Sequence, residues 1–501
     1  MPVKLISKWD FLTVQNRWKS LIQKMLFNTL HFAIFLPVVF ILYWSLRKNF
    51  KLQNILLLAA SYFFYACWDW RFLFLLVFST LLDYCSGLVM AGTNHQSRKK
   101  FWLWLSISIN VGFLGIFKYY NFFSQSLADL LSLFGFQVNP GTIDIILPVG
   151  ISFYTFHGLS YVLDVYKNKI EPEKSFIDYS VFVSFFPLLV AGPIERATHL
   201  LPQLKNERSF TPVKAIDGLK QILWGLFKKA VIADQCAKYV NLAFDNPQNY
   251  GSSTLILGAV LFAFQIYGDF SGYSDIALGV ARLFGIELLR NFAFPYFSRD
   301  IAEFWRRWHI SLSSWFRDYL YIPLGGSKGT NIQKVRNVLI IFLVSGFWHG
   351  ANWTFIVWGL LNAIYILPSV LLKTNRHHLE IVAAGKIFPD SKDLLHILVT
   401  FCLAVFAWIF FRAENLEHAF RYISGIFGGG ITHAPEFLPL DLILLIAFFM
   451  TIEWLGRDQQ FALAKLFHEK PKLIRWGFYY ILIGIIFVFA GSSQQFIYFQ
   501  F

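Results

Sequence analysis

Charged residues are scarce in this chain of 501 residues, since only 15% are Asp, Glu, Lys or Arg. A soluble globular domain carries about 25%. Hydrophobic residues make up 56% of the sequence, and the mean hydropathy is +0.51. This composition excludes a soluble enzyme and a disordered chain. The apolar runs are long and not alternating, which predicts an all-α, polytopic helical membrane protein and not a membrane barrel.

Cysteine is also scarce, and the four cysteines have no metal-ligand or redox spacing: Cys67, Cys85, Cys236 and Cys402. We interpret them as free thiols that are buried in apolar runs. The chain further lacks an HExxH motif, a G-x-S-x-G elbow, a Walker loop and G-x-G-x-x-G. These absences argue against metal-dependent hydrolysis, nucleotide hydrolysis and dinucleotide chemistry, so we expect no bound metal or cofactor.

Acidic residues are outnumbered by basic ones, 30 to 44, for a net charge of +14. The basic residues fall in short clusters between apolar runs, such as Arg98-Lys99-Lys100. This pattern is typical of positive-inside topology and of contact with anionic lipids, so nucleic acid is not an expected partner. The clusters near 47–51 and 98–100 favour a first span that starts outside the cytoplasm.

Apolar runs long enough to cross a bilayer alternate with polar loops from Phe32 onward. We expect about eleven transmembrane helices, with the shorter runs tilted, re-entrant or paired into broken helices. The candidate runs are 32–46, 52–68, 72–91, 101–117, 144–163, 177–193, 254–268, 270–288, 337–349, 351–372, 394–411, 439–455 and 473–491. No internal repeat is visible, which weighs against inverted-repeat transporter folds.

The first 24 residues differ from the rest, because five Lys or Arg alternate with large apolar side chains. We interpret residues 1–24 as a basic amphipathic extension that either lies at the membrane interface or is not native to the mature chain. Residues 25–501 are expected to form a single membrane domain.

Three segments place ionisable groups where lipid-facing residues are expected, and such groups normally face a cavity or a partner. The first, Phe264–Ala277, contains Asp269 and Asp275 among glycines and serines. This mixture predicts an interrupted helix. Close packing of small residues between helices is the alternative, and it explains the glycines but not the two aspartates.

The second segment, Ala302–Leu324, contains His309. On a continuous helix His309 shares a face with Trp305, Ser313 and Phe316. Glu303 is placed to pair with Arg307 on a neighbouring face. The alternative is a plain interfacial helix with aromatic anchors.

The third segment, Leu343–Trp358, places His349 between Trp348 and Gly350, with Asn352 close by. A histidine in such a segment is either a functional group or a spectator that hydrogen-bonds a neighbouring helix. Elsewhere in the chain, His157 also lies in an apolar context.

The tracts FWRRWHISLSSWFRDYLYIPLGG (304–326) and SGFWHGANW (345–353) resemble the membrane-bound O-acyltransferase (MBOAT) family. The likeness is to the bacterial branch that O-acetylates alginate and other exported polysaccharides. Supporting tracts lie at 147–166, 191–204 and 267–286, and the resemblance covers about residues 25–500. That branch more usually carries Gln at the position of His157.

The resemblance implies that His349 is the catalytic histidine and His309 the second characteristic histidine. It also implies a helical fold around a central tunnel in the cell membrane. Acetyl-CoA or another acyl thioester, acting as a substrate, enters from the cytosolic side. The acyl group then passes to a periplasmic or extracellular partner protein and a polysaccharide acceptor.

The chemistry agrees, because a positioned imidazole is well suited to take the proton of an acceptor hydroxyl. We expect His349 to act as the general base, with Asn352 and the Gly346 and Gly350 backbone near the oxyanion. His309 is expected to orient the thioester or assist the leaving thiolate. The remaining predicted substrate-site residues are Trp305, Arg306, Trp348, His157 and, as polar anchors, Asp269 and Asp275.

Two alternatives stay open, and a third is disfavoured. A transporter or flippase for a glycan or lipid-linked intermediate would use the histidines as a proton relay. A different acyltransferase of the same family would move D-alanine or a fatty acyl chain. A membrane scaffold has no evident use for two histidine tracts.

Overall fold

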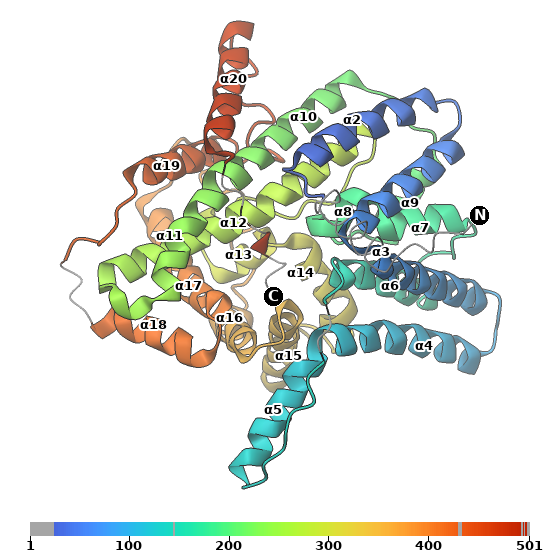
Figure 1. Ribbon diagram of the computed structural model, residues 1–501, viewed down its shortest axis with the longest axis horizontal. Helices are drawn as coiled ribbons and strands as arrows, with labels where there is room; N and C mark the ends of the chain where they lie inside the picture. Colours follow the sequence, from blue (N-terminus) through green and yellow to red (C-terminus); the bar gives the residue numbers. More distant parts are fainter. Residues whose placement is uncertain (1–24, 144–145, 429–432, 492–493, 495, 498–501) are drawn as a thin grey trace, which may run out of the picture. The chain divides into compact units, whose positions relative to one another are not determined.

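The structure is a computed structural model that describes residues 25–143, 146–428, 433–491, 494 and 496–497. The extension 1–24 lies outside the described residues. Every regular element of the described chain is helical (Figure 1), so the predicted all-α fold is confirmed. The chain forms two compact units: unit 1 within residues 1–111, 147–190 and 196–210, and unit 2 within 112–146, 191–195 and 211–501.

Unit 1 is built from apolar helices of the first part of the chain. Its elements are α2 (Leu30–Ser45), α3 (Phe50–Ala91), most of α4 (Gln96–Leu114), α6 (Ile151–Tyr166), α7 (Phe176–Ser184), α8 (Phe186–Ala191) and α9 (Ala197–Lys205). The predicted spans 52–68 and 72–91 are the two halves of α3. The backbone leaves the helical conformation between them at Asp69, whose carboxylate pairs with Arg71.

Unit 2 carries the two histidine tracts and most of the remaining helices. Its elements include η1 (Gly115–Tyr119), α5 (Tyr120–Leu133), α10 (Pro212–Phe227), η2 (Lys228–Ala233), α11 (Asp234–Asp245), α12 (Ser252–Leu283), α13 (Ile301–Arg307), α14 (Ile310–Phe316), η5 (Arg317–Tyr321), α15 (Asn331–His349), α16 (Trp353–Leu371), α17 (Ser391–Arg412), α18 (Leu416–Gly428), α19 (Leu440–Leu455) and α20 (Lys472–Phe489). The short helices η3 (Pro247–Asn249) and η4 (Pro295–Phe297) lie in its loops.

Helix α12 is the centre of unit 2, and most of its residues are buried. The expectation of an interrupted helix near 264–277 was wrong, because α12 runs without a break from Ser252 to Leu283. Its glycines let α10 approach closely instead. A Cβ on Gly272 would lie 2.8 Å from the carbonyl oxygen of Gly225, and one on Gly279 would lie 2.5 Å from that of Gly218. The alternative of small-residue helix packing is the correct one.

Six helices of the described chain are long and apolar enough to cross a bilayer, and α2 is a shorter apolar helix. This confirms a polytopic membrane protein but not the expected number of eleven spans. The predicted spans 254–268 and 270–288 merge into α12. The run 177–193 divides at Phe185 into α7 and α8.

The cysteines are free, as predicted, and Cys236 is buried. The prediction of burial is wrong for Cys402, which is exposed on α17, and Cys67 and Cys85 are only partly buried. An apolar run in a membrane protein does not imply burial, since a spanning helix can present apolar side chains to lipid as well as to protein.

Candidate active site

His349 is the last residue of α15, at the turn of the hairpin that α15 forms with α16. Two glycines make this hairpin tight. A Cβ on Gly346 would lie 2.3 Å from the carbonyl oxygen of Phe355, and one on Gly359 would lie 2.4 Å from that of Phe342. The hairpin leaves only 6% of His349 exposed. The local sequence therefore buries an imidazole at a helix end.

Aromatic rings and a second imidazole surround the His349 ring. The ring centroids of Trp358 and Phe411 lie 5.1 Å and 5.4 Å away, both edge-on. The His309 ring centroid lies 6.4 Å away. The structure thus brings the two histidine tracts together, although 40 positions separate these residues in the sequence.

His309 does not lie on a helix, so the predicted face shared with Trp305, Ser313 and Phe316 was wrong. Helix α13 ends at Arg307 and α14 begins at Ile310. Between them His309 has φ 42° and ψ 55°, the left-handed conformation that side chains with a Cβ seldom adopt. This break turns the imidazole toward Phe270, whose ring centroid is 4.7 Å away.

Several polar atoms around His309 are buried without a hydrogen-bond partner in the described part of the chain. They include both ring nitrogens of His309, the indole nitrogen of Trp305 and the side-chain nitrogen of Asn291. Asn291 is adjacent to the histidine, since its carbonyl oxygen accepts the Ile310 N–H at 2.9 Å. Buried polar groups are normally paired, so such a cluster indicates a place for a polar ligand.

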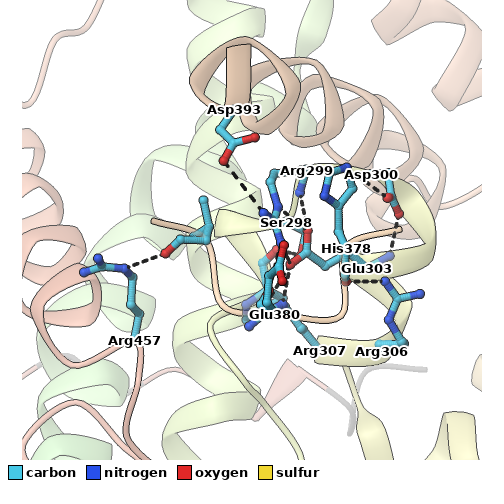
Figure 2. A network of polar contacts seen from close by, with 12 residues as sticks. Ser298, Arg299, Asp300, Glu303, Arg306, Arg307, His378, Glu380, Asp393 and Arg457 are labelled. Carbon is cyan, nitrogen blue, oxygen red and sulfur yellow. Dashed lines mark hydrogen bonds and ion pairs between the residues drawn. The ribbon is translucent and has the colours of Figure 1, made fainter. Parts of the chain in front are cut away.

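Arg306, one of the predicted substrate-site residues, binds the loop between α16 and α17 (residues 372–390; Figure 2). Its guanidinium donates to the carbonyl oxygens of Asn375 at 2.6 Å and of His378 at 2.8 Å. These bonds use two of its five N–H donors. Arg306 therefore anchors this loop to the segment that ends at His309.

The same segment contains a buried acidic residue, Glu303, which pairs with two arginines (Figure 2). Its contact with Arg307 is 2.8 Å, which confirms the predicted pair, and its contact with Arg299 is 3.1 Å. Both arginines also donate to the carbonyl oxygen of Glu380. The segment before His309 is thus held at the 372–390 loop by several charged groups.

Asp269 pairs with Lys229 of η2 at 2.7 Å, and it accepts the backbone N–H of Ile497 at 2.6 Å. Lys229 also donates to the carbonyl oxygen of Gln494 at 3.0 Å. The adjacent Phe496 is fully buried, and its ring centroid lies 6.3 Å from that of Phe270. Asp269 therefore anchors the backbone at Ile497, so that Phe496 lies beside Phe270, the residue whose ring contacts His309.

Asp275 belongs to a separate buried ion-pair cluster. It pairs with Lys228 at 2.9 Å and accepts a hydrogen bond from Gln221 at 2.8 Å. Lys228 also pairs with Glu453 of α19 at 3.1 Å. Each aspartate of α12 is thus balanced by its own lysine of η2.

Asn352 caps the start of α16, where its side-chain oxygen accepts the Thr354 N–H at 3.0 Å. Its side-chain nitrogen donates to the carbonyl oxygen of Glu414 at 2.6 Å. Both polar atoms are therefore engaged near His349. Trp305 packs its ring 5.7 Å from that of Trp358, which also contacts His349.

His157 lies in unit 1, on α6, whereas His309 and His349 lie in unit 2. The His157 ring is buried, with Nδ1 3.3 Å from the carbonyl oxygen of Val183. Its role in the substrate site stays a prediction.

Two residues that contact the end of α15 were not among the predicted site residues. Lys118 of η1 donates to the carbonyl oxygens of Trp348 and His349, and Tyr119 donates to that of Phe347. A signal was present, because Lys118 is a charged residue between the predicted run 101–117 and the aromatic residues that follow it. Asn291 was missed as well, as an amide in a run of aromatic and apolar residues. No group of three His, Cys, Asp or Glu residues is placed to hold a metal ion in the portion described.

The sequence profile of the membrane-bound O-acyltransferase family matches residues 172–410. The chain is 40% identical over 404 residues to the probable alginate O-acetylase AlgI of Pseudomonas aeruginosa, covering 80% of this chain and 75% of that protein. It is 35% identical over 527 residues to the peptidoglycan O-acetyltransferase of Helicobacter pylori, covering 95% and 98% of the two chains. The teichoic acid D-alanyltransferase of Streptococcus thermophilus is 29% identical, over 58% of this chain and 75% of its own.

These matches and the paired histidines define the class of protein. The chain is a multi-pass membrane enzyme that transfers acyl groups to oxygen. It belongs to the membrane-bound O-acyltransferase family.

Proposed function

We propose that the protein transfers an acetyl group from a cytosolic thioester to a hydroxyl group of an exported polysaccharide, with His349 as the general base. The observation that carries the proposal is the pair of buried imidazoles, His309 and His349, with ring centroids 6.4 Å apart. Two further polar atoms are buried without a hydrogen-bond partner in the described chain: the side-chain nitrogen of Asn291, which bonds Ile310 through its backbone, and the indole nitrogen of Trp305, which packs on Trp358 beside His349. This is the composition expected of a site that binds a polar reactive group away from water.

The orientation of unit 2 follows from the charges of its loops. Connections 372–390 and 456–471 meet at one end, where Arg457 donates to the carbonyl oxygens of Val382, Ala383 and Lys386. They contain six basic residues: Lys373, Arg376, Lys386, Arg457, Lys465 and Lys470. Connections 246–251, 413–428 and 433–439 lie at the opposite end and contain one, Arg421. The positive-inside rule therefore assigns the 372–390 end to the cytosol.

With this orientation the two histidines are held from opposite ends of the unit. The segment ending at His309 is bonded to the cytosolic 372–390 loop through Arg306. The turn after His349 is bonded to the opposite end through Asn352 and the carbonyl of Glu414. A donor from the cytosol and an acceptor from the other side would thus meet between the two rings.

In the reaction, the acceptor oxygen attacks the carbonyl carbon of the thioester while His349 accepts the hydroxyl proton. The tetrahedral intermediate then collapses, the carbon–sulfur bond breaks, and the thiolate leaves and is protonated. A positioned general base contributes about 10²–10⁴-fold to such a step. The acyl group ends as an oxygen ester, and His349 returns to its neutral form.

His309 is proposed to orient the thioester. A neutral imidazole has one N–H donor and one acceptor nitrogen, and both ring nitrogens of His309 are buried without a hydrogen-bond partner in the described chain. Its N–H is therefore available to the developing oxyanion, an interaction that is typically worth about 3 kcal/mol. The buried indole N–H of Trp305, whose ring packs on the Trp358 ring that contacts His349, is proposed as a second donor.

The other predicted residues are proposed to act indirectly. Asp269 and Asp275 act as charge-paired anchors, as their lysine contacts support. Arg306 holds the cytosolic loop in place of contacting donor phosphates. Asn352 orients the His349 turn, and a direct bond to the oxyanion would require it to release Glu414.

The acceptor class is proposed from the relatives, which are named for alginate and peptidoglycan acetylation. Both are polysaccharides that lie outside the cytoplasm. A periplasmic or extracellular partner protein is proposed to receive the acyl group before the polymer does.

The test uses the purified chain in liposomes with labelled acetyl-coenzyme A and an oligosaccharide acceptor. We expect label to reach a hydroxyl acceptor with the wild-type protein, and the rate to fall at least about 100-fold with His349→Ala. His468→Ala, at an exposed loop histidine, is the matched control and should retain full activity. Transfer at the wild-type rate by His349→Ala would overturn the assignment. Acetyl-independent passage of glycan would instead support the transporter alternative.

A further inference from the structure

The last turn of α15 is capped in an unusual way. The final carbonyl groups of an α-helix have no partner within the helix, and a left-handed glycine often satisfies them. Here the residue after His349 is Gly350, which has φ −163° and is extended. The carbonyl groups at the end of α15 are instead satisfied from another part of the chain.

The donors come from η1, a π-helical turn between α4 and α5. The Lys118 ammonium donates to the carbonyl oxygen of Trp348 at 2.8 Å and to that of His349 at 3.0 Å. Tyr119 donates to that of Phe347 at 3.2 Å, and its ring stacks on the Phe347 ring at 4.3 Å. Three consecutive carbonyl groups of α15 are therefore bound by two consecutive residues of η1. Such π-turns occur frequently at functional sites.

The charge of Lys118 is directed at this helix end. No carboxylate in the described chain lies within ion-pair distance of it, whereas Lys228 and Lys229 each have two. A cation is stabilised at the C-terminus of a helix because the helix dipole is negative there. The structure thus places a positive charge against the backbone of the catalytic histidine itself.

We propose that Lys118 is a positioning residue for acyl transfer: its ammonium fixes the last turn of α15 and holds the His349 imidazole in its neutral, proton-accepting form. The proposal rests on the proposed function of His349. A neighbouring cation disfavours a second positive charge, so it opposes premature protonation of the imidazole.

The other groups around the His349 ring do not replace this charge. From α16 and α17 the ring meets Trp358 and Phe411, which are uncharged. From the segment before α14 it meets His309. Tyr119 of η1 reaches the backbone at Phe347 through its hydroxyl. Among these groups of the described chain, the Lys118 ammonium therefore supplies the positive charge at the end of α15.

The test compares Lys118→Met, which removes the charge and the donor, with Lys118→Gln, which keeps a donor, and Lys118→Arg, which keeps the charge. We expect Lys118→Met to lower kcat about 10- to 100-fold, with KM for the thioester changed less than about threefold, because the base is misplaced. The acid limb of its pH–rate profile should move to higher pH by about 0.5–1 unit. Lys118→Gln should recover part of kcat, but the acid limb of its pH–rate profile should be displaced as in Lys118→Met. Lys118→Arg should return the acid limb to its wild-type position.

Lys220→Met is the matched control, since Lys220 is also half-buried in unit 2 and hydrogen-bonds Asp217 at 3.1 Å. It should leave kcat and the pH profile unchanged. A kcat within twofold of wild type in folded Lys118→Met or Lys118→Gln overturns the proposal. A lower kcat with an unchanged acid limb of the pH–rate profile also overturns the proposal, because Lys118 would then act only as a structural cap of α15. If Lys118→Met does not fold, the comparison of Lys118→Gln with the wild-type protein provides the test.

His349→Ala, measured in parallel, separates the proposal for Lys118 from the proposed function. If His349→Ala retains activity, the function assigned to His349 is wrong, whatever the Lys118 variants show.

Discussion

The left-handed backbone of His309 costs roughly 1–3 kcal/mol relative to an ordinary conformation, and it persists only where the surroundings determine it. Those surroundings are visible on both sides of the residue. Trp308 before it is almost fully buried, and Ile310 after it is bonded to Asn291. The strained position directs a ring with two unpartnered nitrogens to the neighbourhood of His349.

Because of this backbone conformation, the contribution of the His309 ring to catalysis can be tested with substitutions that keep the protein folded. Asparagine tolerates the left-handed region better than most residues, so His309→Asn should fold with little loss of stability. We expect its kcat to fall about 10²–10³-fold, as for the loss of an oxyanion donor. His309→Gly, which accepts the same backbone freely, should be at least as impaired. Steady-state kinetics measure the kcat of each variant, and thermal unfolding in detergent measures its stability. A kcat near the wild-type value in either variant would exclude the proposed role of His309.

At the scale of elements, small residues decide where helices meet. Gly272 and Gly279 of α12 lie against Gly225 and Gly218 of α10, so backbone rests on backbone. Because lipid is as apolar as a helix surface, this close packing and the neighbouring ion pairs of η2, and not water exclusion, hold the helices together. The same device closes the α15–α16 hairpin around His349.

Gly272→Ala should therefore destabilise the protein. Its Cβ would lie 2.8 Å from the Gly225 carbonyl oxygen, and such overpacking costs about 1–3 kcal/mol. Gly477→Ala on α20 is the matched control, since its Cβ meets nothing within 4 Å and alanine favours a helix. Thermal unfolding in detergent should show a lower Tm for Gly272→Ala and an unchanged or higher Tm for Gly477→Ala. Equal effects would contradict the packing argument.

At the scale of the whole molecule, the proposed function requires that reagents from two compartments meet. The loop charges of unit 2 provide the orientation, with basic residues gathered in connections 372–390 and 456–471. The arginines that hold the His309 segment belong to the same end. The proposed orientation therefore places the His309 segment toward the donor side.

Cysteine labelling tests this orientation. Lys386→Cys and Glu417→Cys change exposed residues at opposite ends of unit 2. A membrane-impermeant maleimide should label Glu417→Cys in right-side-out vesicles and Lys386→Cys in inverted ones, because the basic end is cytosolic. The unsubstituted chain measures background from the native thiols. The reverse pattern would invert the proposed path of the donor.

The helical membrane architecture was predictable from the sequence, and the wrong predictions about where helices break have a common cause. The kink at Asp69 lies at the boundary between the predicted runs 52–68 and 72–91, which were expected as two spans and are the two halves of α3. The interruption expected in α12 was not found, because glycine and aspartate there serve contacts with α10 and η2. Sequence patterns do not distinguish a helix that breaks from one that packs tightly. His309 shows the opposite error, where a regular helical pattern conceals a break.

The sequence by itself determined the membrane class, the helical fold and the two histidine tracts. Hydrophobicity and local motifs depend on neighbouring residues, so they can be read along the chain. The tertiary structure alone decided that the two imidazoles meet and that Lys118 reaches the backbone of His349 from 231 positions away. Such contacts depend on how helices pack, and packing depends on side chains that are distant in sequence.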